Sequence, residues 1–206
     1  MYQFIETIKL EDGDLIGLDL HQERLDRTLL NFYPNRSIDL CRVLENEALP
    51  TDGLYRLTVT YSDRVEKIKW VPYRLRSIDH FVLVEAPDVA YRYKYSDREI
   101  FSKISEVVPS NCEAIITQKG LITDTTYTNL IFLKEGQWYT PSTALLKGTQ
   151  RERLLRQGTI KELDIRVDNL HTFDSFRVIN AMMDMSMGEI YDIKKNVKDF
   201  NPIQFL

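Results

Sequence analysis

The chain has 206 residues, which is enough for one or two compact domains with full hydrophobic cores. With 43% hydrophobic and 28% charged residues, and few glycines and prolines, it has the composition of an ordinary globular protein, which argues against disorder. The net charge of −4 argues against nucleic acid and anionic membranes as partners, because both favour proteins with a basic excess.

The chain shows no sign of a membrane anchor, a secretion signal or a metal site. No apolar run approaches the roughly 20 residues that span a bilayer, and the N-terminus lacks the pattern of a signal peptide, so a cytoplasmic protein is expected. Cys41 and Cys112 have apolar neighbours and are expected to be free and buried. The three histidines, His21, His80 and His171, are too scattered to predict a zinc site or a Ser-His-Asp arrangement, and no metal is expected.

Hydrophobic periodicity predicts an α+β unit in the first half of the chain. Its expected elements are, in chain order, strands at Tyr2–Leu10 and Leu15–Leu18, helices at Leu20–Asn31 and Asp39–Ala48, and strands at Tyr55–Tyr61, Val65–Val71 and Phe81–Glu85. Asp19 is the expected N-cap of the first helix. Because Leu25 and Leu29 lie at helical spacing, this helix is expected to pack on the sheet.

A second, β-rich unit is predicted after a segment without clear periodicity. We expect a small N-terminal domain at residues 1–86, a linker at 87–93 and a C-terminal domain at 94–206. The expected elements of the C-terminal domain are a helix at Ser96–Val107, strands at Glu113–Gln118, Leu121–Thr123, Leu130–Leu133 and Trp138–Thr140, a helix after Gly148, a strand at Asp164–Val167, a helical piece near Leu170 and a strand at Phe176–Met182. Lys119-Gly120 and Glu135-Gly136 have the composition of hairpin turns.

Four features of the chain could carry chemistry, although each has a commoner structural explanation. They are the helix start at Gly148-Thr149-Gln150, whose N–H groups suit an anion, the arginine Arg24 on the first helix, Lys94 between two tyrosines, and Asp124 in a hydroxyl-rich β segment. The alternatives are an ordinary helix start, a solvated arginine, a solvated lysine and a strand-end carboxylate that faces water. Together, an amine, a carboxylate and phosphate donors are the groups that pyridoxal phosphate needs, because the carboxylate keeps the pyridine nitrogen protonated.

Four blocks of sequence follow one another along the chain: "FIETIKLEDGDLIGLDLHQERLDRTL", "KYSDREIF", "EAIITQKGLITDTTYTNLIFLKEGQWYTPSTALLKGTQRERLL" and "DSFRVINAMMDM". Their order resembles the class IV aminotransferase family, which includes branched-chain aminotransferases, D-amino acid aminotransferases and 4-amino-4-deoxychorismate lyases. The likeness extends from about Phe4 to Met185, and the third block is the most specific. It implies an α+β, two-lobed fold with a small N-terminal α/β sandwich and a larger C-terminal β-rich domain. It also implies pyridoxal 5′-phosphate as cofactor and a homodimer.

The resemblance implies a role for each matching residue. Lys94 matches the lysine that bonds the cofactor, and Asp124 matches the acidic partner of its pyridine nitrogen. The residues that match cofactor-binding positions at the phosphate are Arg24 in "HQERL", the backbone of Thr149 and Gln150, and the Asn180-Ala181 turn, which also lies on the substrate side.

Several positions depart from the family pattern. The family has Glu where this chain has Asp124, and the lost methylene shortens the reach of the carboxylate by roughly 1.5 Å. Gln150 stands where Thr is usual. Family members carry a further strand and an Asp-Arg segment before "FIET", so the N-terminus is expected to be shortened, and "TVTYSDRVEK" lacks the arginine- and glycine-rich loop of the lyases.

Within the family, three features favour a lyase that eliminates pyruvate from an amino-substituted chorismate. These are "VINAMMDM", "KYSDRE" and Thr7, which matches a threonine associated with proton transfer, so Thr7 is a candidate catalytic residue beside Lys94. The alternatives are an aminotransferase of branched-chain or D-amino acids, and a non-catalytic member that keeps the fold. In each catalytic case the partner is a small-molecule amino substrate, whose identity the motifs leave open. His21 and Tyr95 are plausible neighbours of the site, and Arg98 is either a carboxylate contact or a surface ion pair.

Overall fold

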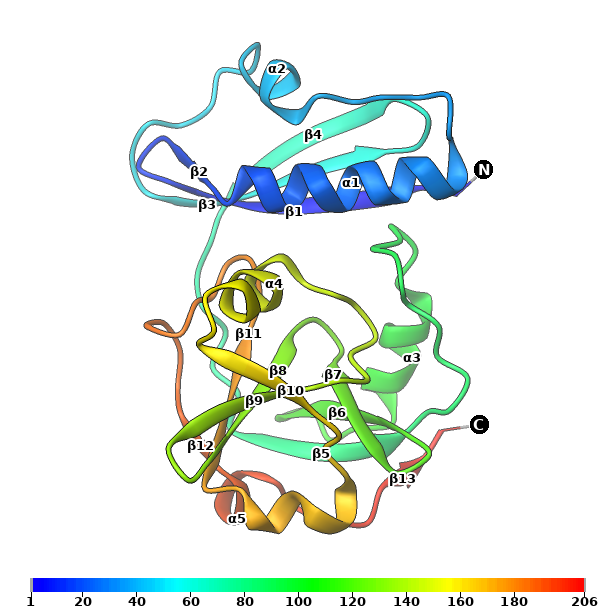
Figure 1. Cartoon of the computed structure of the whole chain (residues 1–206), viewed down its shortest axis with the longest axis vertical. Coiled ribbons are helices and arrows are strands. Elements are labelled where there is room, and N and C mark those ends of the chain that lie inside the picture. The colour runs from blue at the N-terminus through cyan, green and yellow to red at the C-terminus, as the bar shows by residue number, and fades with distance from the viewer. Residues whose placement is uncertain (1, 206) are drawn as a thin grey trace. The chain divides into compact units, whose positions relative to one another are not determined.

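The computed structural model describes residues 2–205, which form two compact units (Figure 1). Unit 1 contains the chain up to Leu75 together with Tyr93–Asp97. Unit 2 contains Arg76–Arg92 and the chain from Arg98 onward. Within the described residues, no helix combines the length and apolar character needed to cross a lipid bilayer.

Unit 1 is one antiparallel sheet with two helices. Its elements are β1 (Phe4–Glu11), β2 (Asp14–Ile16), α1 (Leu18–Phe32), α2 (Leu40–Leu44), β3 (Leu54–Tyr61) and β4 (Val65–Pro72), with strand order β2-β1-β3-β4. The turn between β1 and β2 is tight, and Asp12 and Gly13 both have positive φ there. All six elements were expected from the sequence, and all but α2 differ little in their bounds.

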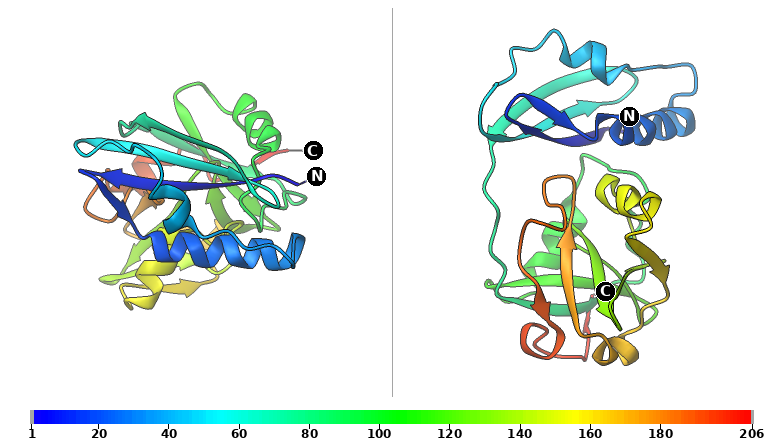
Figure 2. Two further views of the ribbon diagram at one scale, coloured as in Figure 1. Left: turned by 90° about the horizontal axis from the view of Figure 1, so that it is seen from above. Right: turned by 60° about the vertical axis from the view of Figure 1, so that its left-hand side comes forward.

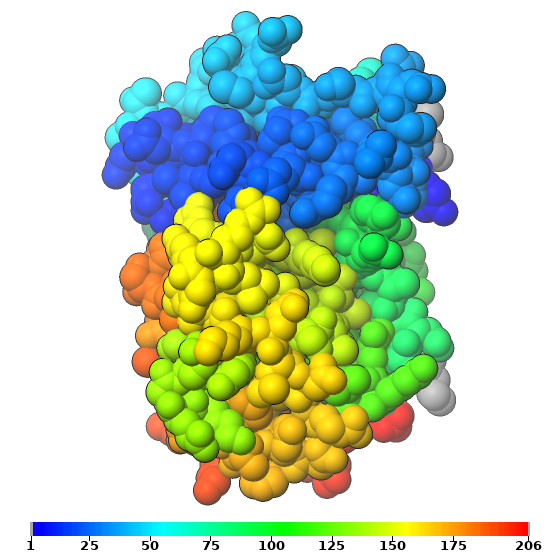
Figure 3. Space-filling model, viewed as in Figure 1, coloured from blue at the N-terminus to red at the C-terminus, as the bar shows by residue number. Residues whose placement is uncertain are grey.

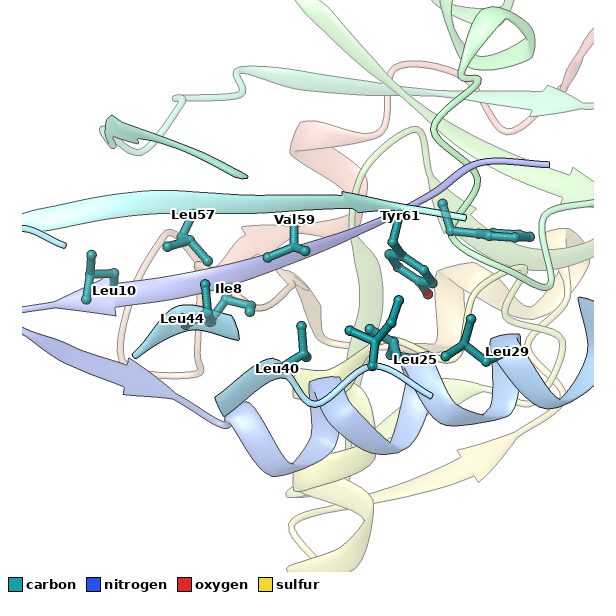
Figure 4. Packing of buried hydrophobic residues seen from close by; sticks show 11 residues of the cluster. Ile8, Leu10, Leu25, Leu29, Leu40, Leu44, Leu57, Val59 and Tyr61 are labelled. Atoms are coloured by element: carbon teal, nitrogen blue, oxygen red, sulfur yellow. The ribbon is translucent and has the colours of Figure 1, made fainter. Parts of the chain in front are cut away.

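The core of unit 1 lies between the sheet and its helices. Leu25 and Leu29 of α1 pack toward Ile8, Leu57 and Val59 of the sheet, and all five side chains are buried (Figure 4). Burying a side chain of this size contributes roughly 1.5–3 kcal/mol. In Figure 3 the blue atoms of α1 face the viewer, beside the darker blue of the β1–β2 hairpin. The predicted packing of the first helix on the sheet is therefore confirmed.

The helix starts differ in part from the expected ones. The N-cap of α1 is Gly17, which has a φ of 68°, and not Asp19; Asp19 lies within the first turn, where its charge suits the helix dipole. Asp39 does cap α2, because its side chain accepts a hydrogen bond from the Arg42 N–H at 3.0 Å. The helix α2 is shorter than predicted, and the Asn46 side chain bonds the Arg42 carbonyl just beyond its end.

A short segment from the middle of the chain joins unit 1. The Ile5 N–H donates to the Lys94 carbonyl and the Ser96 N–H donates to the Gln3 carbonyl, both at 2.9 Å, so this segment lies beside the start of β1. Phe4 pairs with Tyr95 across it, with ring centroids 5.1 Å apart. The bonding of Ser96 also explains why the following helix begins at Glu99 and not at Ser96.

The expected domain boundaries therefore differ from the observed division. Residues 76–86 were placed in the first domain, but they belong to unit 2, because the strand at His80–Glu85 pairs in parallel with a strand of that unit. Lys94 was placed in the C-terminal domain, but its segment belongs to unit 1. The chain passes between the units near residues 75, 92 and 97, and not once through a linker at 87–93.

Unit 2 contains two sheets and several short helices, seen from a second direction in Figure 2. One sheet has the order β10-β9-β8-β11-β12 and the other has the order β13-β5-β6-β7. The elements are β5 (His80–Glu85), α3 (Glu99–Glu106), β6 (Cys112–Gln118), β7 (Leu121–Thr125), β8 (Asn129–Lys134), β9 (Gln137–Pro141), α4 (Thr149–Arg156), β10 (Ile160–Leu163), the 3₁₀ helix η1 (Val167–Thr172), β11 (Ser175–Ile179), β12 (Tyr191–Asp192), α5 (Ile193–Asn196) and β13 (Ile203–Gln204).

Two strands of unit 2 lie elsewhere than predicted. A strand was expected at Asp164–Val167, but the observed strand is β10 at Ile160–Leu163. It lies there because these residues pair in parallel with β9. β11 ends at Ile179 and not at Met182, because Asn180 and Met183 exchange two backbone hydrogen bonds in a turn. The hairpin turns at Lys119-Gly120 and Glu135-Gly136 are confirmed, and all four residues have positive φ.

The two cysteines are both free, but only one has the predicted burial. Cys112 is buried at the start of β6, as expected. Cys41 is exposed, because it lies on the outer side of α2, whereas Leu40 and Leu44 face the core.

Candidate functional site

A buried cluster of charged side chains lies between β1 and α1 in unit 1. Glu6 lies on the same face of β1 as Phe4 and Ile8, so its carboxylate points toward α1. His21 and Arg24 are three residues apart and therefore lie on one face of the helix. Glu6 Oε1 accepts from Arg24 Nε at 2.9 Å, and Glu6 Oε2 lies 2.5 Å from Arg24 Nη2 and 2.6 Å from His21 Nδ1.

The charges of this cluster follow from its contacts. Burial raises the pKa of Glu6, but the charge of Arg24 and the hydrogen bonds of His21 and Arg24 outweigh it and lower that pKa to about 2. Burial lowers the pKa of His21, against the hydrogen bond and charge of Glu6 that raise it, so His21 is neutral near pH 7. Because an ionised carboxylate only accepts hydrogen bonds, the proton of neutral His21 is assigned to Nδ1.

The two predicted catalytic residues, Lys94 and Thr7, also belong to unit 1. Lys94 lies in the segment beside the start of β1, and its positive charge is near enough to lower the pKa of His21. Thr7 lies on the face of β1 opposite to Glu6 and pairs with Thr58 of β3. Unit 1 therefore contains Arg24, His21, Lys94 and Thr7, with Lys94 near enough to affect His21 and Thr7 on the face of β1 opposite to Glu6.

Asp124 occupies a buried position in β7 of unit 2. Its side chain is 4% exposed, so it is not the water-facing carboxylate of the simpler explanation. Oδ1 accepts from Asn129 Nδ2 at 2.8 Å, and Oδ2 accepts from the Leu146 N–H at 2.9 Å. Burial raises the pKa of Asp124 to about 6, against the bonds from Leu146 and Asn129 and the charge of Arg151, which lower it.

The hydroxyl-rich run after Asp124 forms a tight turn between β7 and β8. The Thr125 hydroxyl accepts from the N–H groups of Tyr127 and Thr128, at 3.3 and 3.0 Å. Glu113 accepts from the N–H and the hydroxyl of Thr126, at 3.1 and 2.5 Å. The turn therefore needs side-chain acceptors at these positions, and it fixes the spacing between Asp124 and Asn129.

The helix α4 begins beside Asp124, in the motif Leu-x-Gly-x-x-Arg. Thr149 and Gln150 are both buried at the helix start, where the first backbone N–H groups lack intrahelical acceptors. Arg151 is 1% exposed and donates to the Pro141 carbonyl at 3.0 Å and to Glu162 at 2.6 Å. The arginine of the motif thus anchors α4 to β9 and β10.

The remaining two candidates have structural partners of their own. Asn180 forms the turn that follows β11, and its side chain accepts from the Met182 N–H at 2.8 Å, with Ala181 between them. Arg98 is neither a surface ion pair nor a solvated side chain. Its guanidinium donates to the Tyr91 hydroxyl at 3.1 Å and to the Thr126 carbonyl, and lies 4.7 Å from the Phe101 ring centroid.

Two polar residues beside the candidate set were missed from the sequence, Glu6 and Asn129. Glu6 could have been found, because a charged residue in the apolar phase of the strand "FIETIKL" requires a buried partner. Asn129 had no such signal, since its partners become neighbours only in the fold. Among residues 2–205, no group of three or more His, Cys, Asp or Glu side chains is placed to hold a metal ion.

Comparison with known proteins identifies the family. A sequence model described as amino-transferase class IV matches residues 3–187, which is most of the chain. The chain belongs to the class IV aminotransferase family. A Haemophilus influenzae relative that bears only the name uncharacterized protein is 34% identical over 185 residues, covering 88% of this chain and 98% of that protein.

Solved structures of the same fold agree with this assignment. A protein of Haemophilus somnus, provisionally named 4-amino-4-deoxychorismate lyase, is 30% identical with a TM-score of 0.84, covering 90% of this chain and 98% of that one. A hypothetical aminotransferase of Mycobacterium tuberculosis in its PLP-bound form is 13% identical with a TM-score of 0.76, covering 99% and 84%. The second likeness shows the fold alone. The expected two-lobed, mixed α/β fold of class IV aminotransferases is therefore confirmed.

Enzymes of the class IV family depend on pyridoxal phosphate, and the side chains of this chain fit that cofactor. In unit 2, the buried Asp124 carboxylate accepts from Asn129 and the Leu146 N–H, and a carboxylate has lone pairs for a further donor such as a ring N–H. The start of α4, which lies beside Asp124, suits a phosphate. In unit 1, Lys94 supplies an amine and Arg24 a guanidinium whose plane Glu6 fixes.

Proposed function

We propose that this protein is a pyridoxal-phosphate-dependent lyase that eliminates pyruvate from 4-amino-4-deoxychorismate and forms 4-aminobenzoate. The observation that carries the proposal is the likeness to the Haemophilus somnus protein, which bears a lyase name and matches nearly the whole length of both chains. Thr7 is a second support, because it stands at the position of the lyase threonine in "FIET".

Each candidate residue has a role in this proposal. Lys94 would bond the cofactor, Asp124 would pair with its pyridine nitrogen, and Arg24 would contact its phosphate. The backbone of Thr149 and Gln150 and the Asn180-Ala181 turn would complete the phosphate contacts. When bound, the cofactor supplies an electron sink for negative charge at the carbon beside the substrate nitrogen.

Proton movement falls to the side chains of unit 1. The Lys94 amine would move a proton at the reacting carbon of the substrate. The Thr7 hydroxyl assists proton transfer as the pyruvate group leaves. The ionised Glu6 carboxylate would hold the Arg24 guanidinium, and burial lowers the pKa of His21, which favours its neutral form beside Lys94.

Product analysis tests the proposal. Purified protein with added pyridoxal phosphate is given 4-amino-4-deoxychorismate, and pyruvate is followed by a coupled dehydrogenase while 4-aminobenzoate is followed by fluorescence. The proposal expects both products in equal amounts, and Thr7→Val should slow their formation about a hundredfold. Amino transfer from branched-chain or D-amino acids without pyruvate release would overturn the lyase in favour of an aminotransferase. Bound cofactor without either product would point to a non-catalytic family member.

The assembly and location of the protein are part of the same proposal. The family resemblance supports a homodimer with a small-molecule amino substrate, and the sequence is of the kind expected for a cytoplasmic protein. Analytical ultracentrifugation at micromolar concentration is expected to give twice the chain mass of 24.2 kDa, and a single chain mass would contradict the dimer.

A further inference from the structure

Asn129 joins the Asp124 carboxylate to the loop that leads into α4. Its side chain is 4% exposed, and its Nδ2 atom donates to Asp124 Oδ1 and to the Leu146 carbonyl, each at 2.8 Å. The Leu146 N–H donates in turn to Asp124 Oδ2 at 2.9 Å. Asp124, Asn129 and the backbone of Leu146 therefore form a closed ring of hydrogen bonds.

Gly148 makes room for this ring. Its φ of −69° and ψ of 149° can be adopted by any residue, so the backbone does not require glycine there. The other seven glycines, all within the described residues, have positive φ. A Cβ on Gly148 would overlap the Asn129 Oδ1 atom. Gly148 is therefore explained by the space that the Asn129 amide occupies.

We propose that Asn129 is a positioning residue that holds the Asp124 carboxylate in place for the pyridine nitrogen of the cofactor, and that Gly148 lacks a side chain so that Asn129 can do so. This inference rests on the function proposed above, since it assumes that the carboxylate pairs with that nitrogen. Such a side chain acts by holding the carboxylate in place, and it does not need to contact the substrate.

The chemistry of the ring agrees with this role. Both N–H groups of the Asn129 amide point at acceptors, so the amide orientation is determined by its partners. Loss of the amide would leave Asp124 Oδ1 and the Leu146 carbonyl without this donor in a buried place. The bond to Oδ1 also lowers the pKa of Asp124, against the effect of burial. This bond therefore favours the ionised carboxylate, which is the form that pairs with a protonated pyridine nitrogen.

The first test uses the protein without cofactor. The titration of the Asp124 carboxyl is followed by ¹³C NMR in the wild type, in Asn129→Ala and in Asn169→Ala. Asn169 lies in the same unit, and its side chain accepts from the Arg166 N–H, so it is a matched control away from Asp124. We expect the pKa of Asp124 to rise in Asn129→Ala and to stay unchanged in Asn169→Ala. An unchanged pKa in Asn129→Ala would overturn the positioning role.

The second test measures the dissociation constant of pyridoxal phosphate by absorbance titration. Asn129→Ala and Gly148→Ala are each expected to weaken binding about tenfold to hundredfold, the effect of one disrupted buried polar contact. Asn169→Ala should remain within about twofold, as a surface contact does. The double variant Asn129→Ala with Gly148→Ala should bind no more weakly than Asn129→Ala alone, because the added methyl group then has space. Additive losses in the double variant would contradict the contact.

These results separate the inference from the proposed function. A wild-type protein that binds no pyridoxal phosphate would overturn the proposed function, and with it the cofactor role of Asn129. Cofactor binding that survives Asn129→Ala unchanged would overturn the positioning role alone. If Asn129→Ala does not fold, Gly148→Ala displaces the amide without removing it and yields the same two measurements.

Discussion

The Glu6 carboxylate and the Arg24 guanidinium meet edge to edge in the core of unit 1, with Nε–Oε1 and Nη2–Oε2 distances of 2.9 and 2.5 Å. Removing one partner of such a buried pair leaves an uncompensated charge. We therefore expect Glu6→Gln to lower the free energy of unfolding at pH 7 by about 3–5 kcal/mol, measured by urea denaturation. The control is Glu99→Gln, which breaks the exposed Glu99–Lys103 pair and should cost less than about 1 kcal/mol. Equal losses in the two variants would contradict the role of the buried pair.

The same pair predicts a pH dependence of stability. The pKa of Glu6 is lowered from 4.5 to about 2 in the folded chain, so the unfolded chain binds more protons between these values. The stability that ionised Glu6 contributes, about 3 kcal/mol, is complete above pH 4.5 and is lost as the pH falls toward 2. The difference in unfolding free energy between wild type and Glu6→Gln should therefore shrink below pH 4.5. A difference that stays constant down to pH 2.5 would contradict the assigned pKa.

Asp124 predicts the opposite dependence. Its pKa is raised from 3.8 to about 6, so the folded chain binds more protons than the unfolded one between these values and loses stability as the pH rises through them. Asp124→Asn cannot ionise, so the stability of the wild type relative to this variant should fall by about 3 kcal/mol between pH 3.5 and pH 7. Urea denaturation at several pH values measures this, and a parallel pH profile in both proteins would refute the buried carboxylate.

Arg98 predicts a local effect on the turn that follows Asp124. Its guanidinium holds the Thr126 carbonyl and the Tyr91 hydroxyl and lies over the Phe101 ring. Arg98→Lys keeps the charge but loses the planar fork, so we expect a loss of about 1–2 kcal/mol and faster amide hydrogen exchange at residues 124–129. Arg92→Lys, at an exposed position, is the control and should change neither. Unchanged exchange at the turn in Arg98→Lys would show that Glu113 alone holds it.

Most helices and strands of this fold were predicted correctly because the patterns that specify them lie within a few consecutive residues. The alternation of β1, the stripe of Leu25 and Leu29 in α1 and the hairpin glycines act within a few residues, and each was confirmed. The observed division differs from the expected one at Lys94 and Ser96, which bond Ile5 and Gln3 through backbone hydrogen bonds that leave no side-chain pattern in the sequence.

The candidate site shows the same limit. Asp124 and the start of α4 were found from motifs. The roles of Asn129 and Gly148 depend on a contact between residues 19 positions apart, which exists only in the folded chain. Glu6 lies between these cases. Its position in a strand was predicted, whereas its partners His21 and Arg24 came from the packing of α1 on that strand.

The most direct test of the central claim is the visible absorption spectrum of the purified protein with pyridoxal phosphate, compared with Lys94→Ala. Lys147→Ala is the control, since Lys147 is an exposed lysine next to the start of α4. The account predicts a cofactor band shifted from that of free pyridoxal phosphate and fixed by borohydride in the wild type and in Lys147→Ala, and absent in Lys94→Ala. A spectrum of free cofactor in all three proteins, or a fixed band that survives in Lys94→Ala, would contradict it.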